Sequence, residues 1–100
     1  FNTFTKIINY LNEIDNVAKK CAGFRCTGSA AIDLCLVASG KTDAFYQRNL
    51  KLWDMCSGVL IVKEAGGLVT QPNGNEWTIE STDILASNSF IHEQVQVNLK

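Results

Sequence analysis

The sequence of 100 residues predicts one α/β domain, and two features carry this prediction. Short segments rich in β-branched and aromatic residues alternate with longer segments in which apolar residues recur every three or four positions. Glycines and an Asn-Gly pair separate these segments, as expected where a chain turns. Strands that alternate with helices favour a layered unit with mostly parallel pairing in the sheet and helices on both of its faces.

The first segment, from Phe4 to Cys21, is predicted to be an amphipathic helix. Its apolar residues form one stripe, and lysine, asparagine and glutamate occupy the opposite face. Gly23 would end this helix, because glycine is common just after a helix C-terminus. Residues 24–27 then read as a short strand.

A second helix is predicted over residues 29–39, with Asp33 as its only charge, and it would end at Gly40. A helix that is apolar on almost all sides must be covered on more than one face. Residues 43–47 follow as an aromatic strand.

The third helix, residues 53–65, is also apolar on nearly every side and is predicted to be almost wholly buried. Its first turn carries one carboxylate, Asp54, and Gly66 and Gly67 end it. Residues 68–70 form the next predicted strand, and the Pro and Asn-Gly of residues 71–74 indicate a turn.

The last third of the chain holds one open prediction and two firm elements. Residues 76–79 either return as a short strand or stay irregular. Residues 83–87 are predicted to be a strand, and residues 90–99 a final helix with Ile91, Val95 and Leu99 inward.

Composition excludes several classes of protein. Nine basic and ten acidic residues, without a run of like charge, predict no general attraction to nucleic acid or to an anionic membrane. No segment reaches the roughly 18 consecutive apolar residues that span a bilayer. Four single cysteines predict reduced, buried thiols in a cytoplasmic protein, because zinc sites use closely spaced pairs. The chain starts with Phe1 inside a helical pattern, so we expect a piece of a longer protein.

Asp54 is the first candidate for a functional residue, and two roles remain open for it. A carboxylate at a helix start caps the backbone and suits the helix dipole, and it can equally ligate a cation. The turn Gly28-Ser29-Ala30-Ala31 either binds an anion through free N–H groups or only lets helix and strand approach closely. Gln47 suits a hydroxyl-bearing ligand. His92, the only histidine, is expected to be an ordinary, partly exposed residue.

Four blocks of sequence, in order, resemble the C-terminal half of the inositol monophosphatase family. They are Gly-Ser-Ala-Ala-Ile-Asp-Leu-Cys at 28–35, Asp-Ala-Phe-Tyr-Gln at 43–47, Leu-Trp-Asp at 52–54 continued to Glu-Ala-Gly-Gly at 64–67, and Ile-Leu-Ala-Ser-Asn at 84–88. The resemblance covers the chain from about Phe24 to its end. It implies the C-terminal half of a layered αβαβα sandwich, so that residues 1–100 would be an α/β domain whose N-terminal half is missing.

The resemblance also implies an activity and a site. The family hydrolyses inositol phosphates or related sugar phosphates with Mg²⁺ and is lithium-sensitive. Asp54 matches a metal ligand, and Gly28, Ser29, Ala30 and Gln47 match substrate-contacting positions. The remaining metal ligands of the family belong to the missing half, so the isolated chain is expected to be inactive and to need that half to cover its apolar helices.

One departure and two alternatives accompany this interpretation. The family usually has Glu where Gln47 stands, which alters the expected hydroxyl preference. The parent protein could instead act on a bisphosphorylated nucleotide or on fructose bisphosphate. It could also have a non-catalytic role, since bacterial members associate with the transcription machinery. The resemblance further implies a homodimer.

Overall fold

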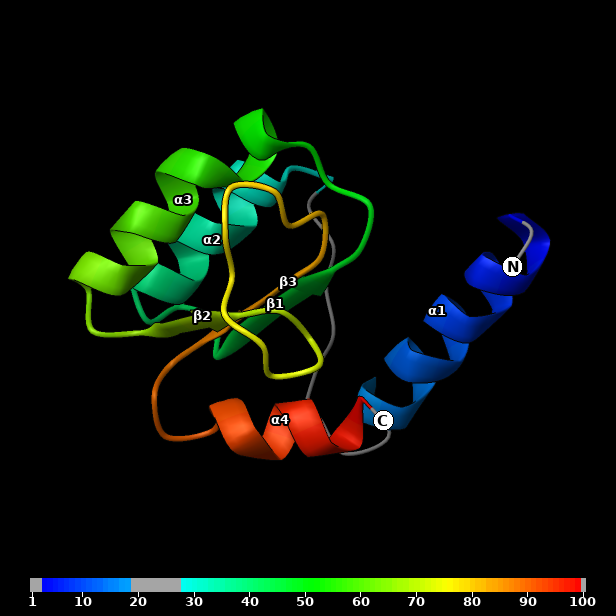
Figure 1. Cartoon of the computed structure of the whole chain (residues 1–100). Helices are drawn as coiled ribbons and strands as arrows, with labels where there is room; N and C mark the ends of the chain where they lie inside the picture. Colours follow the sequence, from blue (N-terminus) through cyan, green and yellow to red (C-terminus); the bar gives the residue numbers. More distant parts are fainter. Residues whose placement is uncertain (1–2, 19–27, 100) are drawn as a thin grey trace.

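The computed structural model describes residues 3–18 and 28–99, which form four helices and three strands (Figure 1). In chain order these elements are α1 (Thr3–Ala18), α2 (Ala30–Ala38), β1 (Ala44–Gln47), α3 (Leu52–Glu64), β2 (Leu68–Thr70), β3 (Ile84–Ser87) and α4 (His92–Asn98). Each of them overlaps an element that the sequence predicts. The strand expected at residues 24–27, the helix end at Gly23, and Cys21 and Cys26 lie outside the described residues.

The sheet has the order β1-β3-β2, and both pairs are antiparallel. The prediction of mostly parallel pairing is therefore wrong for these three strands. The alternation of strand and helix does make β1 and β2 run in the same direction on either side of β3. However, β3 occupies the place between them and runs the other way, which gives a split β-α-β unit.

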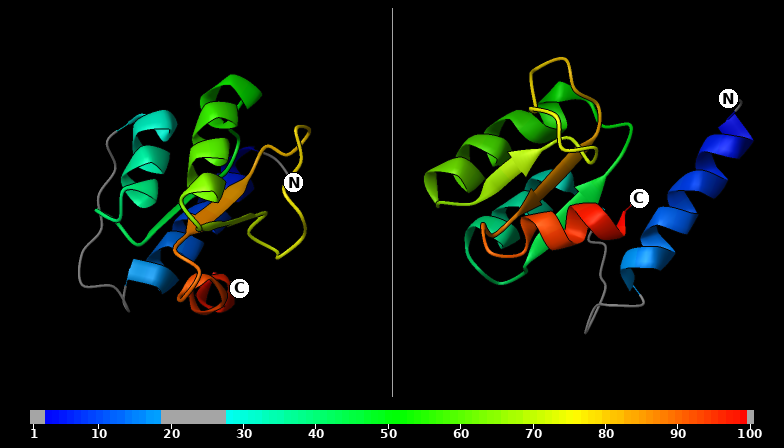
Figure 2. Two further views of the ribbon diagram at one scale, coloured as in Figure 1. Left: turned by 90° about the vertical axis from the view of Figure 1, so that its left-hand side faces the viewer. Right: turned by 60° about the horizontal axis from the view of Figure 1, so that its bottom comes forward.

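Helices cover both faces of this sheet, as predicted (Figure 2). Helices α2 and α3 lie side by side on one face, and α4 lies on the other. Helix α1 stands to one side of the sheet and contacts α4 (Figure 1). The described residues thus form three layers, helix, sheet and helix, with α1 added at the edge.

The apolar core fills the space between the sheet and the α2–α3 layer. Leu34, Met55 and Val62 project from the helices, and Ile84 and Ala86 project from β3; all are buried. Gly58 makes the close contact of the two helices possible, because a Cβ built at this position would lie 2.5 Å from Cδ1 of Leu34. The small residue therefore fixes the distance between α2 and α3.

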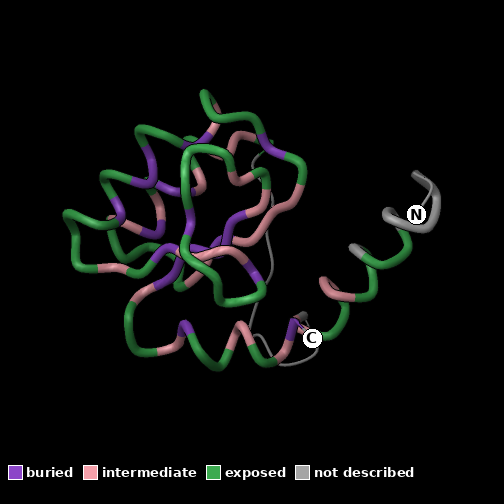
Figure 3. The backbone as a smooth tube through the Cα atoms, viewed as in Figure 1, coloured by how far each residue is buried: buried purple, intermediate pink, exposed green. Residues whose placement is uncertain are grey.

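The outer side of the α2–α3 layer is exposed (Figure 3), as expected for apolar helices that need another half of the protein to cover them. Within this chain alone, the prediction that α3 is almost wholly buried therefore does not hold. Leu60 is 61% exposed and Ile61 is 44% exposed on α3, and Ile32 is 54% exposed on α2. Met55, Gly58, Val59 and Val62 form the buried side of α3. Several exposed apolar side chains on one face are typical of a surface that contacts another element or a partner.

The structure also bears on the predictions for residues 76–79, for the cysteines and for membrane-spanning segments. Of residues 76–79, only Glu76 makes a strand-like bridge, to Thr70, and the rest is irregular. Cys35 and Cys56 are exposed free thiols rather than buried ones, because they project from the uncovered sides of α2 and α3. In the part of the chain that the structure describes, no helix has the length and apolarity to cross a membrane.

Candidate functional site

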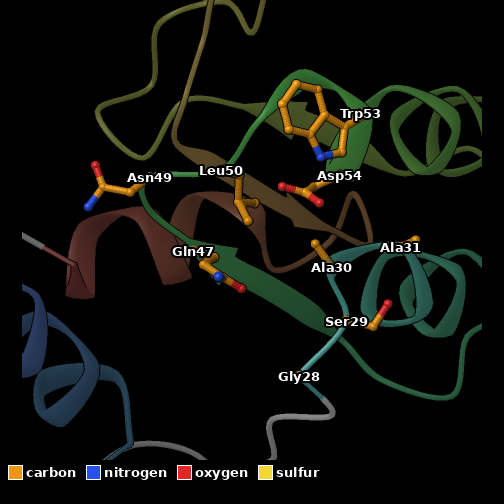
Figure 4. Close-up of a pocket in the computed structure, with 9 residues that line it drawn as sticks. All are labelled: Gly28, Ser29, Ala30, Ala31, Gln47, Asn49, Leu50, Trp53 and Asp54. Carbon is orange, nitrogen blue, oxygen red and sulfur yellow. The ribbon is translucent and has the colours of Figure 1, made fainter.

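A cavity of about 430 Å³ lies where the starts of α2 and α3 meet the end of β1. Nine residues line it: Gly28, Ser29, Ala30, Ala31, Gln47, Asn49, Leu50, Trp53 and Asp54 (Figure 4). All five residues predicted from the sequence as site residues are therefore brought together. Their roles in binding remain predictions, whereas their proximity is a property of the fold.

The first wall of the cavity is the start of α2. Gly28 has φ +84°, a conformation that residues with a side chain rarely adopt. Ser29 is the N-cap, and its Oγ accepts a hydrogen bond from the N–H of Ile32 at 3.3 Å. The first turn of a helix carries N–H groups without partners inside the helix, and these give its N-terminus a partial positive charge. The helix dipole at this wall thus favours an anion, whereas the carboxylate of Asp33 in the same turn opposes it.

The second wall is the start of α3, where Asp54 occupies the third helical position. Its Oδ2 accepts a hydrogen bond from the backbone N–H of Lys51 at 3.0 Å, which is the carboxylate half of a capping box. The capping role left open by the sequence is thus present. One carboxylate oxygen is enough for this bond, so capping does not exclude ligation of a cation through Oδ1.

The third wall is formed by Gln47, at the end of β1, and by the turn that leads to α3. Asn49 lies in this turn with φ +60°, the only described residue other than glycine with a positive φ. The N–H of Leu50 donates to the carbonyl oxygen of Thr82 at 2.7 Å. Sequence reasoning missed Asn49, Leu50 and Trp53 as cavity residues. The Trp-Asp pair was a signal for Trp53, which is 76% exposed at the rim.

The charges of the cavity restrict what it can hold. Among the described residues that line it, Asp54 alone carries a formal charge. No group of three or more His, Cys, Asp and Glu residues that could bind a metal occurs in the described ranges 3–18 and 28–99. A Mg²⁺ ion needs near-octahedral oxygen coordination. Asp54 therefore fits as one ligand of such an ion, but the described residues do not complete the site.

A second polar cluster lies on the opposite face of the sheet and involves the single histidine. His92 is 4% exposed, so its prediction as a partly exposed residue is wrong. Its Nδ1 lies 2.6 Å from Oγ of Ser87, and its Nε2 lies 2.8 Å from Oγ1 of Thr70. Burial lowers the pKa of His92 below its ordinary value. This cluster does not line the cavity and ties α4 to β2 and β3.

The fold and the cavity define an α/β protein with a cavity at two helix N-termini that also contains one carboxylate. Comparison with known proteins gives the family: the model of the inositol monophosphatase family matches residues 3–99, and the chain belongs to this family. It is 40% identical over 92 residues to inositol-1-monophosphatase of Caulobacter vibrioides, covering 91% of this chain and 36% of that protein. It is 38% identical over 91 residues to Nus factor SuhB of Salmonella typhimurium, covering 91% of this chain and 34% of that protein.

Solved structures agree with this assignment. The crystal structure of extragenic suppressor protein suhB from Bartonella henselae superimposes with a TM-score of 0.88 at 42% identity, covering 92% of this chain and 36% of that chain. The chain thus spans about a third of the length of the relatives it matches. The resemblance inferred from the four sequence blocks is confirmed at the level of the family.

Proposed function

We propose that the parent protein hydrolyses a phosphate monoester of inositol or of a related sugar, with Mg²⁺ as cofactor. In this proposal Asp54 is one metal ligand, and Gly28, Ser29, Ala30 and Gln47 contact the substrate. The observation that carries it is the meeting of two helix starts at one cavity that also contains a carboxylate.

The electrostatics of the cavity support a phosphate ester as the ligand. The N-termini of α2 and α3 favour negative charge, as they do in many phosphate sites. Asp54 by itself would repel a phosphate, and a cation bound between the two would remove that repulsion and polarise the phosphoryl group. Gln47 offers both a donor and an acceptor to a hydroxyl group on the part of the substrate away from the phosphate.

A second part of the proposal concerns the organisation of the protein. Residues 1–100 are a C-terminal α/β domain, and an N-terminal half of the same protein covers the exposed side of the α2–α3 layer and supplies the other metal ligands. The exposed Ile32, Leu60 and Ile61 support this, together with the fraction of its relatives that the chain spans. The chain on its own is expected to be inactive.

The substitution Asp54→Asn in the whole protein tests the function. An asparagine keeps an oxygen that accepts from the N–H of Lys51, so the cap is retained while the anionic ligand is lost. We expect the rate of hydrolysis of inositol 1-phosphate with Mg²⁺ to fall by about a hundredfold or more. Glu64→Gln, at the exposed far end of α3, is the matched control and should keep the full rate. An unchanged rate in Asp54→Asn would leave capping as the role of this residue.

The choice of substrate is tested on a panel. Inositol 1-phosphate should be preferred over a bisphosphorylated nucleotide and over fructose bisphosphate. A preference of about tenfold or more for either of the bisphosphates, equal to about 1.4 kcal/mol, would reverse this ranking. Inhibition of the preferred reaction by lithium is also expected.

A non-catalytic role is the second candidate function, and the name of one relative favours it. Nus factor SuhB of Salmonella typhimurium is 38% identical to this chain, which supports an association of the parent protein with the transcription machinery. We expect a cytoplasmic homodimer in either case. Co-elution of the whole protein with purified RNA polymerase, retained in Asp54→Asn, would establish a role separate from hydrolysis; elution as a free protein would exclude it.

A further inference from the structure

The turn that forms the third wall of the cavity is held in place from outside the cavity. It connects β1 to α3, and its residues belong to no helix or strand. Asp83, which directly precedes β3, bonds to this turn twice. Its Oδ1 accepts from the backbone N–H of Asn49 at 3.0 Å, and its Oδ2 accepts from Nη1 of Arg48 at 2.6 Å. The bond between Leu50 and the adjacent carbonyl of Thr82 completes the attachment.

Arg48 extends this attachment to a second element. Its Nε and Nη2 donate to the two carboxylate oxygens of Glu13 in α1, at 3.0 and 2.7 Å, in the paired geometry that guanidinium and carboxylate favour. Nε also lies 2.8 Å from the hydroxyl oxygen of Tyr46. The side chain of Arg48 is one-third exposed, and the side chains of Glu13 and Asp83 are less exposed. Each guanidinium nitrogen of Arg48 therefore has an acceptor, and the side chain lies over the ring of Tyr46, on the face of the sheet opposite Gln47.

The bond from Asn49 to Asp83 is made at the one described residue of the turn with a positive φ. Asn49 has φ +60°, a region that costs free energy for every residue except glycine, although asparagine tolerates it better than most. Its N–H would have no partner in the turn itself, and the carboxylate of Asp83 accepts it. Since Asn49 lies two residues after Gln47 and five before Asp54, its conformation sets how the wall faces the two helix starts (Figure 4).

We propose that Asp83 is a positioning residue of the substrate cavity, which holds Asn49 and Arg48 so that Gln47 faces the ligand. The inference rests on the proposed function, in which Gln47 contacts the part of the phosphate ester that does not react. In this inference the contact of Gln47 with the non-reacting part of the substrate is the same in the ground state and in the transition state, which is uniform binding. Loss of the attachment therefore weakens substrate binding, which raises KM and leaves kcat unchanged.

The test compares three variants of the whole protein in steady-state kinetics with inositol 1-phosphate and Mg²⁺. Asp83→Ala removes both acceptors and should raise KM about tenfold with kcat within about twofold. Asp83→Asn keeps an oxygen for the N–H of Asn49 and should bring KM back to within about threefold of the original. Glu13→Gln weakens the other ion pair of Arg48 but keeps both bonds of Asp83 to the turn, and it should leave both constants within about twofold.

A second measurement keeps the inference testable without activity. Hydrogen exchange of the Asn49 and Leu50 amides should accelerate in Asp83→Ala, while that of the β1–β3 pairs stays slow. If Asp83→Ala does not fold, Asp83→Ser takes its place in both experiments. An unchanged KM in a folded variant, or an equal rise in KM in Glu13→Gln, would overturn the positioning role.

Failure of this inference is distinguishable from failure of the proposed function. If Asp54→Asn abolishes hydrolysis and Asp83→Ala leaves KM unchanged, the function stands and the positioning role is wrong. If Asp54→Asn keeps the full rate of hydrolysis, the proposed function itself is wrong. The exchange of the Asn49 amide then still reports whether Asp83 holds the turn.

Discussion

The two faces of the sheet are built by different means. On the α2–α3 face, contacts are apolar and close: Leu34 packs against Gly58, and the cavity opens at the helix starts. On the α4 face, where Leu85 is also buried, there is in addition a polar contact, with His92 between the hydroxyl groups of Ser87 and Thr70. The first face depends on close apolar packing, whereas the second combines packing with hydrogen bonds to a titratable group. The effect of a substitution should therefore depend on side-chain size on the α2–α3 face, and on hydrogen bonding and pH on the α4 face.

The largest effect on stability is expected at the α2–α3 contact. Gly58→Ala places a Cβ 2.6 Å from the Cβ of Leu34, so the two helices must move apart. Overpacking of this kind should lower the free energy of unfolding by about 3 kcal/mol, as measured by denaturant titration. Ser57→Ala, on the exposed side of the same helix, is the control and should stay within about 0.5 kcal/mol. Equal stability of the two variants would show that shape does not govern this face.

The next effect is expected on the opposite face. His92→Ala leaves the hydroxyl groups of Ser87 and Thr70 without their shared partner and opens a void beside β3. The free energy of unfolding should fall by about 2 kcal/mol. Gln94→Ala, exposed on the same helix, should change it by less than about 0.5 kcal/mol. A loss no larger than that of the control would contradict a structural role for the polar cluster.

A smaller expected effect is a pH dependence of stability, which comes from His92 on the α4 face. Burial lowers the pKa of His92 in the folded chain, so the unfolded chain binds a proton first as the pH falls. The stability from the neutral histidine is complete above its ordinary pKa of about 6.5 and decreases from there down to the folded-state pKa. The loss is at most about 1.4 kcal/mol per pH unit.

Denaturant titrations at pH 7.5 and 5.5 measure this difference. The chain should be less stable at the lower pH, and His92→Gln should show a smaller decrease over the same interval. Gly58→Ala should keep the pH dependence of the original chain, because its effect is steric. An identical pH dependence with and without His92 would assign the decrease to other groups.

The smallest effect on this chain is expected at its outer surface. Leu60→Ser changes a side chain that is 61% exposed, so the stability of the chain should change by less than about 0.5 kcal/mol. In the whole protein the same substitution should cost about 2 kcal/mol, if the proposed N-terminal half buries this residue. Equal effects in the two contexts, by thermal or denaturant unfolding, would show that nothing covers the α2–α3 layer.

The sequence predicts the elements well where local chemistry decides them. Ser29 and Gly40 delimit α2 within a residue, since capping and positive φ depend on the residues themselves. The cavity residues Gly28, Gln47 and Asp54 are also found, through their motifs. Strand order does not depend on local sequence, and residues 84–87 contain no signal that they pair between β1 and β2.

The polar contacts between distant residues escape prediction for the same reason. Arg48 is separated from Glu13 and from Asp83 by 35 residues in each direction, and neither carboxylate stands out in the sequence. His92 follows Ile91 in a helix whose spacing assigns the inward face to Ile91, Val95 and Leu99. Its burial depends on two hydroxyl groups in other strands, which can only be known once the sheet is built.

The central place of β3 also has a consequence for biosynthesis. Both other strands pair with β3 and not with each other, and β3 is the last of the three to be made. While a ribosome is still adding residues before 84, β1 and β2 have no hydrogen-bonding partner among the strands described. The nascent chain therefore carries β1 and β2 without their partner strand until residues 84–87 emerge, a period in which a chaperone can bind it.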